Sequence, residues 1–255
     1  MKGYIGFFDI LGYQSFLKNN SDTAVQDDVL NFIGSLENPG PDFYKTVFPG
    51  LVGNRAEENV RAIFSRIKWL VFSDTVVYTL EPESETDAVP YFVVLGIARN
   101  LMTRMFDYGL PLRGALHFGE YRSTGHSMAG RGIVDAYELA NKLNLSTCVL
   151  TQGMFDRYSM VETAKDPDAL AYFNSQVLEY KTPLTGGQRT VQYNLKSDNM
   201  TFAGARDLRE YVHSKFWAHG KDLGDARAVE KVEETERYII FCKFKGEEMR
   251  VRART

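Results

Sequence analysis

Two aspartates lie inside strongly apolar stretches of the sequence. Asp9 is part of YIGFFDILGYQSFL (residues 4–17) and Asp74 is part of WLVFSDTVVYTL (residues 69–80). Burying an unpaired carboxylate is costly, so each aspartate must lie at a strand end, accept hydrogen bonds, be protonated or bind a metal ion. Two carboxylates brought together repel each other unless a cation lies between them, and hard divalent ions prefer oxygen ligands. The pair could therefore serve two-metal phosphoryl transfer, or each aspartate could simply cap a turn; spacing alone does not decide between these interpretations.

The elements around these aspartates must bring them together for any such chemistry. Residues 3–11 are rich in aromatic and β-branched side chains, which predicts a strand that Gly12 ends. Strand-like runs on both sides of Ser73-Asp74 predict a β-hairpin with Asp74 at or beside its tip. With the first strand beside this hairpin, both carboxylates would lie near one edge of a sheet.

The rest of the chain alternates between helical and strand-like patterns. Apolar residues at helical spacing predict helices over 25–36 (with Ser21 or Asp22 as N-cap), 90–108 and 133–143, and helical structure over 203–238, including one long charged helix in 228–244. Strands are expected at 110–122 and 146–155, a hairpin turning at Gly186-Gly187, a loop of glycines and small polar residues at 123–132, and a loop followed by a short helix at 41–62. This order is typical of an α+β fold with one sheet and helices packed on a face.

Composition limits the classes of function. The 255 residues are 44% hydrophobic and 25% charged, so a sizeable core is available. The net charge of -3 argues against a broad DNA-binding surface and leaves room for a basic pocket that binds a small anion such as a nucleotide. Cys148 and Cys242 lie in apolar segments and are expected to be buried free thiols. With neither a secretory signal nor an apolar stretch long enough to cross a membrane, we expect a soluble cytoplasmic protein.

Four segments of the sequence resemble the ordered motifs of class III nucleotidyl cyclase domains. They are FFDILGY (7–13), FSDTVVY (72–78), LRGALHFGE (112–120) and GIVDAYELANKL (132–143). Within that superfamily they most resemble the pyrimidine cyclases of bacterial anti-phage (Pycsar) systems. The resemblance covers residues 4 to about 150 and implies a mixed, mainly antiparallel sheet on a ferredoxin-like core. Residues 1–195 would then form the catalytic domain, and 196–255 a helical C-terminal extension of it.

The same resemblance assigns roles to residues near Asp9. The metal ligands would be Asp9, the backbone carbonyl of Ile10 and Asp74, holding two Mn²⁺ or Mg²⁺ ions that activate the ribose 3′-hydroxyl and neutralise the leaving phosphates. Substrate would be bound around the end of the first strand, where backbone amides are expected to hold the phosphates. The residues implied there are Phe8, Leu11, Gly12 and Tyr13.

Departures from the family pattern bear on the base of the substrate and on which residue supplies positive charge to the phosphates. Leu70 stands where purine cyclases carry a Lys or Glu that contacts the base edge, which favours a pyrimidine. Glu138 and Lys142 align with the family's transition-state Asn and Arg; Lys142 can supply a cation to the phosphates, whereas Glu138 would repel them. Arg113 and Arg131 are candidates for the missing charge, and a structural salt bridge is an equal alternative for Arg113.

By resemblance, the expected activity is that of a uridylate cyclase, which forms cyclic UMP and pyrophosphate from UTP, with CTP as the next choice. The expected enzyme is a homodimer with active sites at the subunit interface. Its product would be a second messenger for a separate effector protein in anti-phage immunity. A nucleotide-binding regulatory module without turnover and a metal-dependent phosphohydrolase are the alternatives.

Overall fold

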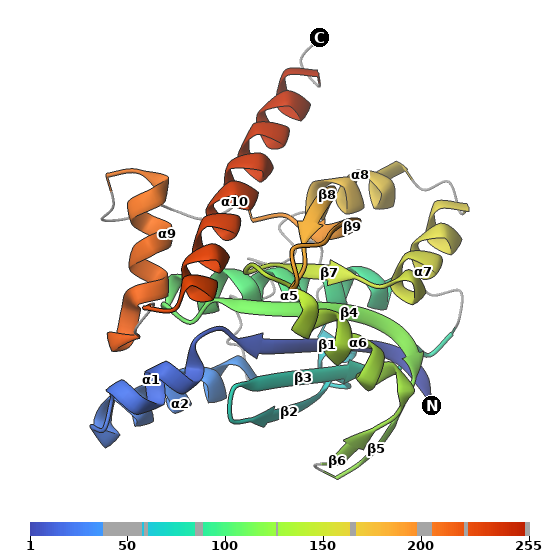
Figure 1. The fold of residues 1–255 in the computed structure, drawn as a ribbon. Helices are drawn as coiled ribbons and strands as arrows, with labels where there is room; N and C mark the ends of the chain where they lie inside the picture. The colour runs from blue at the N-terminus through green and yellow to red at the C-terminus, as the bar shows by residue number, and fades with distance from the viewer. Residues whose placement is uncertain are drawn as a thin grey trace.

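A single seven-stranded sheet organises the computed structural model, which describes residues 1–37, 58, 61–84, 89–125, 127–163, 167–197, 206–221 and 224–252 (Figure 1). In spatial order its strands are β2 (Lys68–Phe72), β3 (Thr75–Leu80), β1 (Lys2–Ile10), β4 (Leu112–Glu120), β7 (Cys148–Leu150), β9 (Arg189–Leu195) and β8 (Val177–Pro183). Only the β4–β7 pair is parallel among these strands. The prediction of a mixed, mainly antiparallel sheet is confirmed.

The first half of the described chain has a ferredoxin-like core. After β1 come α1 (Tyr13–Asn19) and α2 (Thr23–Glu37), then the β2–β3 hairpin, then α5 (Val89–Asp107) and β4. The strand β1 lies between β3 and β4, so this β-α-β-β-α-β order gives the ferredoxin-like arrangement. The expected first strand, hairpin and helix over 90–108 are therefore present. The predicted loop and short helix at 41–62 fall largely outside the described residues.

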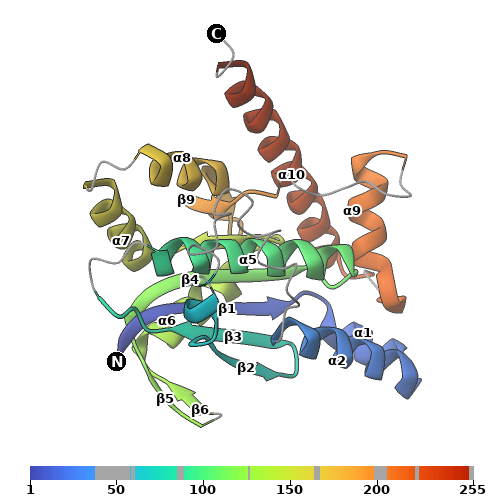
Figure 2. The same ribbon diagram turned by 180° about the vertical axis from the view of Figure 1, so that it is seen from behind.

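Helices cover both faces of the sheet rather than one. Along β1, Tyr4, Phe8 and Ile10 join the cluster under α5, whereas Ile5 and Phe7 join the opposite cluster. That second cluster includes residues of α6 (Arg131–Lys142) and α10 (Ala226–Arg252). Figures 1 and 2 show α6 and α10 on one side of the sheet and α5 on the other. Since β1 is apolar on both sides, its residues need a helical layer on each face.

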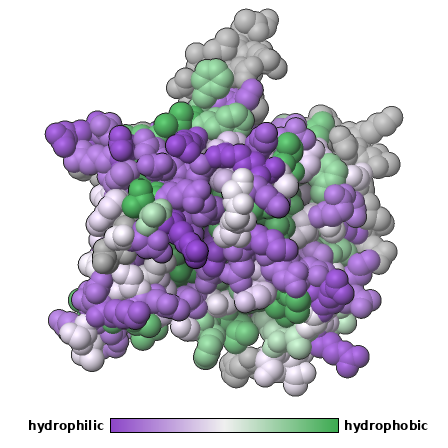
Figure 3. All heavy atoms as spheres, viewed as in Figure 1, coloured by the Kyte–Doolittle hydropathy of each residue, from purple (hydrophilic) through white to green (hydrophobic). Residues whose placement is uncertain are grey.

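The remaining helices pack around this core. They are α7 (Gln152–Thr163) and α8 (Pro167–Gln176) on the α5 side, and α9 (Leu208–Trp217), followed by a short 3-10 turn, Ala218–Gly220. A cluster that includes Leu11, Phe106, Tyr211 and Ile239 joins α9 and α10 to the ends of β1 and α5. The far half of α10 extends beyond the sheet and exposes Phe244, and the surface on this side is mostly hydrophilic (Figure 3).

Several predicted boundaries were wrong for local reasons. The strand expected at 146–155 ends at Leu150, because the Thr151 carbonyl accepts from the N–H groups of Met154 and Phe155 and starts α7. The loop expected at 123–132 contains a two-stranded ribbon, β5 (Arg122–Thr124) and β6 (Ser127–Ala129), and also the start of α6. Helical structure over 203–238 is interrupted between α9 and α10, where His219 has a φ of 59°. The long helix at 228–244, the hairpin at Gly186-Gly187 and the buried free cysteines are confirmed.

Candidate active site

The backbone brings Asp9 and Asp74 to the same end of the sheet. Asp9 is the next-to-last residue of β1 and pairs with Thr75 of β3. The N–H of Ile10 donates to the carbonyl oxygen of Asp74 at 2.9 Å. In a strand, the N–H and C=O of one residue point to the same neighbour, so the Ile10 carbonyl also faces the Asp74 end of β3. Three predicted metal ligands therefore lie together at the ends of β1 and the β2–β3 hairpin.

Asp74 lies in the hairpin turn, after a residue with left-handed backbone. Ser73 has a φ of 55°, which a two-residue hairpin turn requires. Burial raises the pKa of Tyr13, and the negative charge of Asp74 raises the pKa of Tyr13 further, so Asp74 lies near the start of α1. Among the described residues, no hydrogen bond or ion pair involves the Asp74 carboxylate. Its oxygens are available to a ligand.

Arg113 holds the Asp9 carboxylate from the neighbouring strand. It lies opposite Asp9 in the β1–β4 ladder, and its Nε donates to Asp9 Oδ2 at 2.7 Å. Its Nη1 and Nη2 donate to the backbone oxygen and Oδ1 of Asn141 on α6, at 3.0 and 2.7 Å. The two charged side chains are only 17% and 16% exposed. The guanidinium thus ties β1, β4 and α6 together, and the salt-bridge interpretation of Arg113 describes its contacts here.

Burial outweighs this ion pair in setting the protonation of Asp9. Removal from water raises the pKa of Asp9, the charge and hydrogen bond of Arg113 lower it, and the Asp74 carboxylate raises it again. The remaining contribution lowers the pKa of Asp9 and comes from Lys231, on α10. The balance of these effects leaves the pKa of Asp9 raised. A largely buried carboxylate such as Asp9, with the charge of a second carboxylate acting on it, would be stabilised by added positive charge.

Lys231 is a member of this cluster that sequence reasoning missed. It is half-buried, and its pKa is lowered by burial and next by the positive charge of Arg113. The negative charge of Asp9 acts in the opposite direction and raises the pKa of Lys231. Neither a motif nor helical spacing distinguishes this lysine from the other charged residues of α10. The structure thus places two carboxylates and two cations at one end of the sheet.

The predicted substrate-binding residues around the turn have different environments. Phe8 is buried against Tyr78 on the α5 side, so its side chain points away from the Asp9 face. The N–H of Leu11 donates to Pro111 O at 2.8 Å and is already used. Gly12 has a φ of 79° and precedes α1. Within the described part of the chain, the N–H groups of Gly12 and Tyr13 donate to no acceptor. Of the expected amides, only these two make no hydrogen bond to the described residues and are open to a phosphate.

The helix that carries the last motif presents a different residue to the site. Glu138 and Lys142 are both exposed, and no contact joins either to Asp9 or Arg113 within the described residues. Asn141 contacts Arg113 instead. Leu70 is half-buried on β2 and packs against the cluster on the α6 side of the sheet, the side on which Asp9 lies. Arg131 is exposed, and its Nε pairs with the Asp135 carboxylate at 2.8 Å, so its charged contact lies within α6.

The oxygen donors at this end of the sheet fit a hard divalent ion. Two carboxylates and a backbone carbonyl are the ligands that Mg²⁺ and Mn²⁺ prefer, and Mg²⁺ typically uses one or two carboxylates together with water and substrate phosphates. Among the described residues, no group of three or more His, Cys, Asp or Glu side chains could hold a metal ion. A bound ion would therefore need oxygens from phosphate or water as well as those of Asp9 and Asp74.

Comparisons with known proteins leave this site without an assigned activity. No family model matches the chain, and no curated protein matches it. A solved structure similar to it is the catalytic core of a rhodopsin-guanylyl cyclase with converted specificity in complex with ATPalphaS. The two are 11% identical with a TM-score of 0.39, over 76% of this chain and 94% of that chain. Similarity at this level does not establish a shared activity, so the chain's own residues must carry the functional argument.

In the part of the chain that the structure describes, no helix is both long enough and apolar enough to cross a bilayer.

Proposed function

We propose that this protein is a pyrimidine nucleotide cyclase that converts UTP to 3′,5′-cyclic UMP and pyrophosphate, with CTP as the alternative substrate. The observation that carries the proposal is the meeting of Asp9 and Asp74, joined through the Ile10 backbone, at one end of a ferredoxin-like sheet. The order of the four sequence motifs supports it independently. The role in anti-phage signalling and the homodimer remain part of the proposal and rest on the family resemblance.

The reaction joins the ribose 3′-oxygen to the α-phosphorus and breaks the bond between that phosphorus and the oxygen bridging to the β-phosphate. The hydroxyl proton passes to water, and pyrophosphate leaves with the bridging oxygen. Two divalent ions, when bound, would supply Lewis-acid activation of the hydroxyl and charge neutralisation of the phosphates. Asp9, Asp74 and the Ile10 carbonyl would hold these ions.

The protein's own contribution is rigidity and charge balance around these ligands. Asp9 is fixed by its strand and by Arg113, and Arg113 is fixed in turn by Asn141. A ligand carboxylate held in this way loses little conformational freedom when the nucleotide binds. Partial burial also excludes water from Asp9 and strengthens every electrostatic interaction there.

Leu70 supports a pyrimidine substrate within the proposal. An apolar side chain cannot hydrogen-bond a purine edge, and this one lies on the same side of the sheet as Asp9. A site with no hydrogen-bonding side chain at this position gives no preference to a purine and would favour a base that other residues recognise.

The ion pair between Arg113 and Asp9 favours a second candidate function. A carboxylate already paired with a guanidinium could belong to a nucleotide-binding regulatory module that has lost turnover. Both candidates predict triphosphate binding, and only the cyclase should release pyrophosphate.

Labelled nucleoside triphosphates incubated with Mn²⁺ and separated by chromatography would test the proposal. We expect cyclic UMP or cyclic CMP from the wild-type protein and no product from Asp74→Asn. Asp27→Asn, at an exposed position on α2, is the matched control and should behave as wild type. Conversion of ATP alone, or of none of the triphosphates, would contradict the pyrimidine cyclase. A linear monophosphate or diphosphate would indicate a phosphohydrolase.

A further inference from the structure

A chain of three hydrogen bonds fixes α10 against the strand that carries Arg113. The hydroxyl of Ser146 donates to the carbonyl oxygen of Leu112, the residue before Arg113, at 2.7 Å. The N–H of Ser146 donates to Thr235 Oγ1 at 2.8 Å, and that hydroxyl donates to the Lys231 carbonyl oxygen at 2.7 Å. Thr235 is fully buried, so this contact is not a mobile surface interaction.

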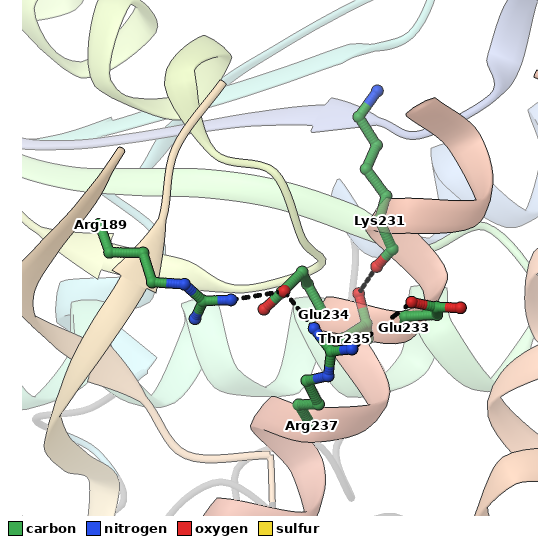
Figure 4. Close-up of polar contacts among 6 residues, drawn as sticks. All are labelled: Arg189, Lys231, Glu233, Glu234, Thr235 and Arg237. Carbon is green, nitrogen blue, oxygen red and sulfur yellow. Dashed lines mark hydrogen bonds and ion pairs between the residues drawn. The ribbon is translucent and has the colours of Figure 1, made fainter. Parts of the chain in front are cut away.

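This chain determines where Lys231 lies. Residues four apart are on the same face of a helix, so Lys231 is one turn from Thr235 on the face that contacts the β4 end. A second anchor comes from Glu234, whose buried carboxylate accepts from Arg189 on β9 at 2.5 Å and from Arg237 at 2.6 Å. In Figure 4 the Lys231 side chain extends away from that ion-pair cluster. The helix is thus anchored at two neighbouring positions, three and four residues after Lys231.

The packing of α10 fixes the position of Lys231, and its ammonium makes no hydrogen bond or ion pair with the described residues. Its charge acts on both Asp9 and Arg113, which places it within the same electrostatic environment as the proposed metal ligands. Among the described residues, no hydrogen bond or ion pair involves its Nζ. Burying part of a lysine without a partner is unfavourable, so a bound anion would stabilise it.

The other candidate cations are less suited to a phosphate. Arg113 uses Nε, Nη1 and Nη2 on Asp9 and Asn141 and would have to break those bonds. Lys142 is exposed, and no contact joins it to Asp9 within the described residues. Of these three, only Lys231 both acts on Asp9 through its charge and makes no hydrogen bond or ion pair through Nζ with the residues that the structure describes.

We propose that Lys231 is the cation that contacts the polyphosphate of the bound nucleotide, so that α10 forms one wall of the active site. The inference rests on the proposed function in one respect: it assumes that the Asp9–Asp74 site accepts a triphosphate. A lysine is suited to this role because its compact ammonium can interact with several phosphate oxygens as a point charge. The positioning residue for Lys231 is Thr235.

Steady-state kinetics and phosphate binding of Lys231→Met test this role. We expect a rise in KM for UTP in the presence of Mn²⁺ of about 10- to 100-fold, the range for losing a hydrogen bond to a charged group. Lys231→Arg, which keeps the charge, should recover most of this loss. Lys181→Met, at an exposed position on edge strand β8, is the control for removing a lysine and should match wild type.

A binding measurement that does not depend on turnover accompanies the kinetics. Tripolyphosphate with Mn²⁺ should raise the melting temperature of the wild-type protein and raise that of Lys231→Met much less. The melting temperature without ligand should be nearly the same in both, because the half-buried ammonium makes no hydrogen bond or ion pair within the described part of the chain.

The possible outcomes separate this inference from the proposed function. If Asp74→Asn abolishes pyrophosphate release and Lys231→Met keeps the wild-type KM, the role of Lys231 is overturned and the cyclase stands. A loss that appears in Lys142→Met instead would also overturn it. If no triphosphate yields a cyclic product, the proposed cyclase activity is wrong, but the tripolyphosphate measurement still tests Lys231. A smaller melting-temperature shift in Lys231→Met than in wild type supports the contact between Lys231 and phosphate. An equal shift, or none in the wild type, rejects it.

Discussion

Replacing Arg113 by methionine should lower the free energy of unfolding at pH 7.5 by about 3 kcal/mol, near the low end of the range for breaking a buried ion pair. Both partners are largely buried, with side chains 17% and 16% exposed, so the Asp9 carboxylate could not be rehydrated fully. The low end applies because some exposure remains and because the Asn141 groups released by the change can bind water. For a chain of this size the loss corresponds to a fall in melting temperature of roughly 6–12 °C.

The loss should depend on pH in a defined direction. In the wild type the pKa of Asp9 is already raised above that of a free aspartate, chiefly by burial. Without Arg113 it should rise further, because the guanidinium lowers it now. A carboxyl group whose pKa is raised by folding favours the folded state below its unfolded pKa, and this contribution is lost as pH rises through the folded pKa. The difference between Arg113→Met and wild type should therefore shrink between pH 7.5 and pH 5.

Thermal unfolding followed by circular dichroism at the two pH values measures this effect. The double variant Asp9→Leu/Arg113→Met also removes the Asp9 carboxylate that would otherwise be left unpaired. It should restore part of the lost stability, since an apolar pair can replace a buried ion pair. A deficit in Arg113→Met that is the same at pH 5 and pH 7.5 would refute the electrostatic reasoning. So would a double variant as unstable as the sum of the two single changes.

Three further predictions concern other charged groups. Asp74→Asn should abolish pyrophosphate release while changing the free energy of unfolding by less than about 0.5 kcal/mol, measured by urea denaturation, because no partner of this partly exposed carboxylate is seen in the described structure. Arg189→Ala should destabilise the protein more than Glu234→Leu in the same assay. The first change leaves the Glu234 carboxylate, only 4% exposed, with less opposite charge beside it, whereas the second leaves an arginine that is 38% exposed and can be hydrated. Burial lowers the pKa of Lys221 to about 7, so the folded state binds fewer protons than the unfolded state above that pH. The melting temperature should therefore rise between pH 7 and pH 9 in wild type, and less so in Lys221→Met.

Local sequence patterns predicted the parts of the site that lie on strands and a tight turn. The apolar run around Asp9 and the paired runs around Asp74 each identify a strand. That the first strand pairs with the hairpin, with Asp9 opposite Thr75, is a long-range contact that the structure supplies. The alternation along β1 even assigns Asp9 to the face opposite Phe8. The strand assignments and the face of Asp9 needed only the period of two in an extended chain.

Sequence patterns could not identify which helical residues reach the site. Gap-free alignment selected Glu138 and Lys142, whereas Asn141 makes the contact with Arg113. Adjacent helical residues point about 100° apart, so an error of one position selects a different face. Lys231 was missed because α10 is rich in charge, and only its packing through Thr235 distinguishes this lysine from its neighbours.

Asp9 and Lys231, which interact at the end of β1, are also synthesised far apart in time. Lys231 follows Asp9 by 222 positions. At translation rates of roughly 5–20 residues per second, the ribosome would need roughly 11–44 s to make the intervening chain. During that interval β1 can pair with the hairpin and with β4, but no ammonium from α10 can yet balance the carboxylates. A nascent chain would thus form its sheet first and acquire the complete charge arrangement only when α10 packs on it.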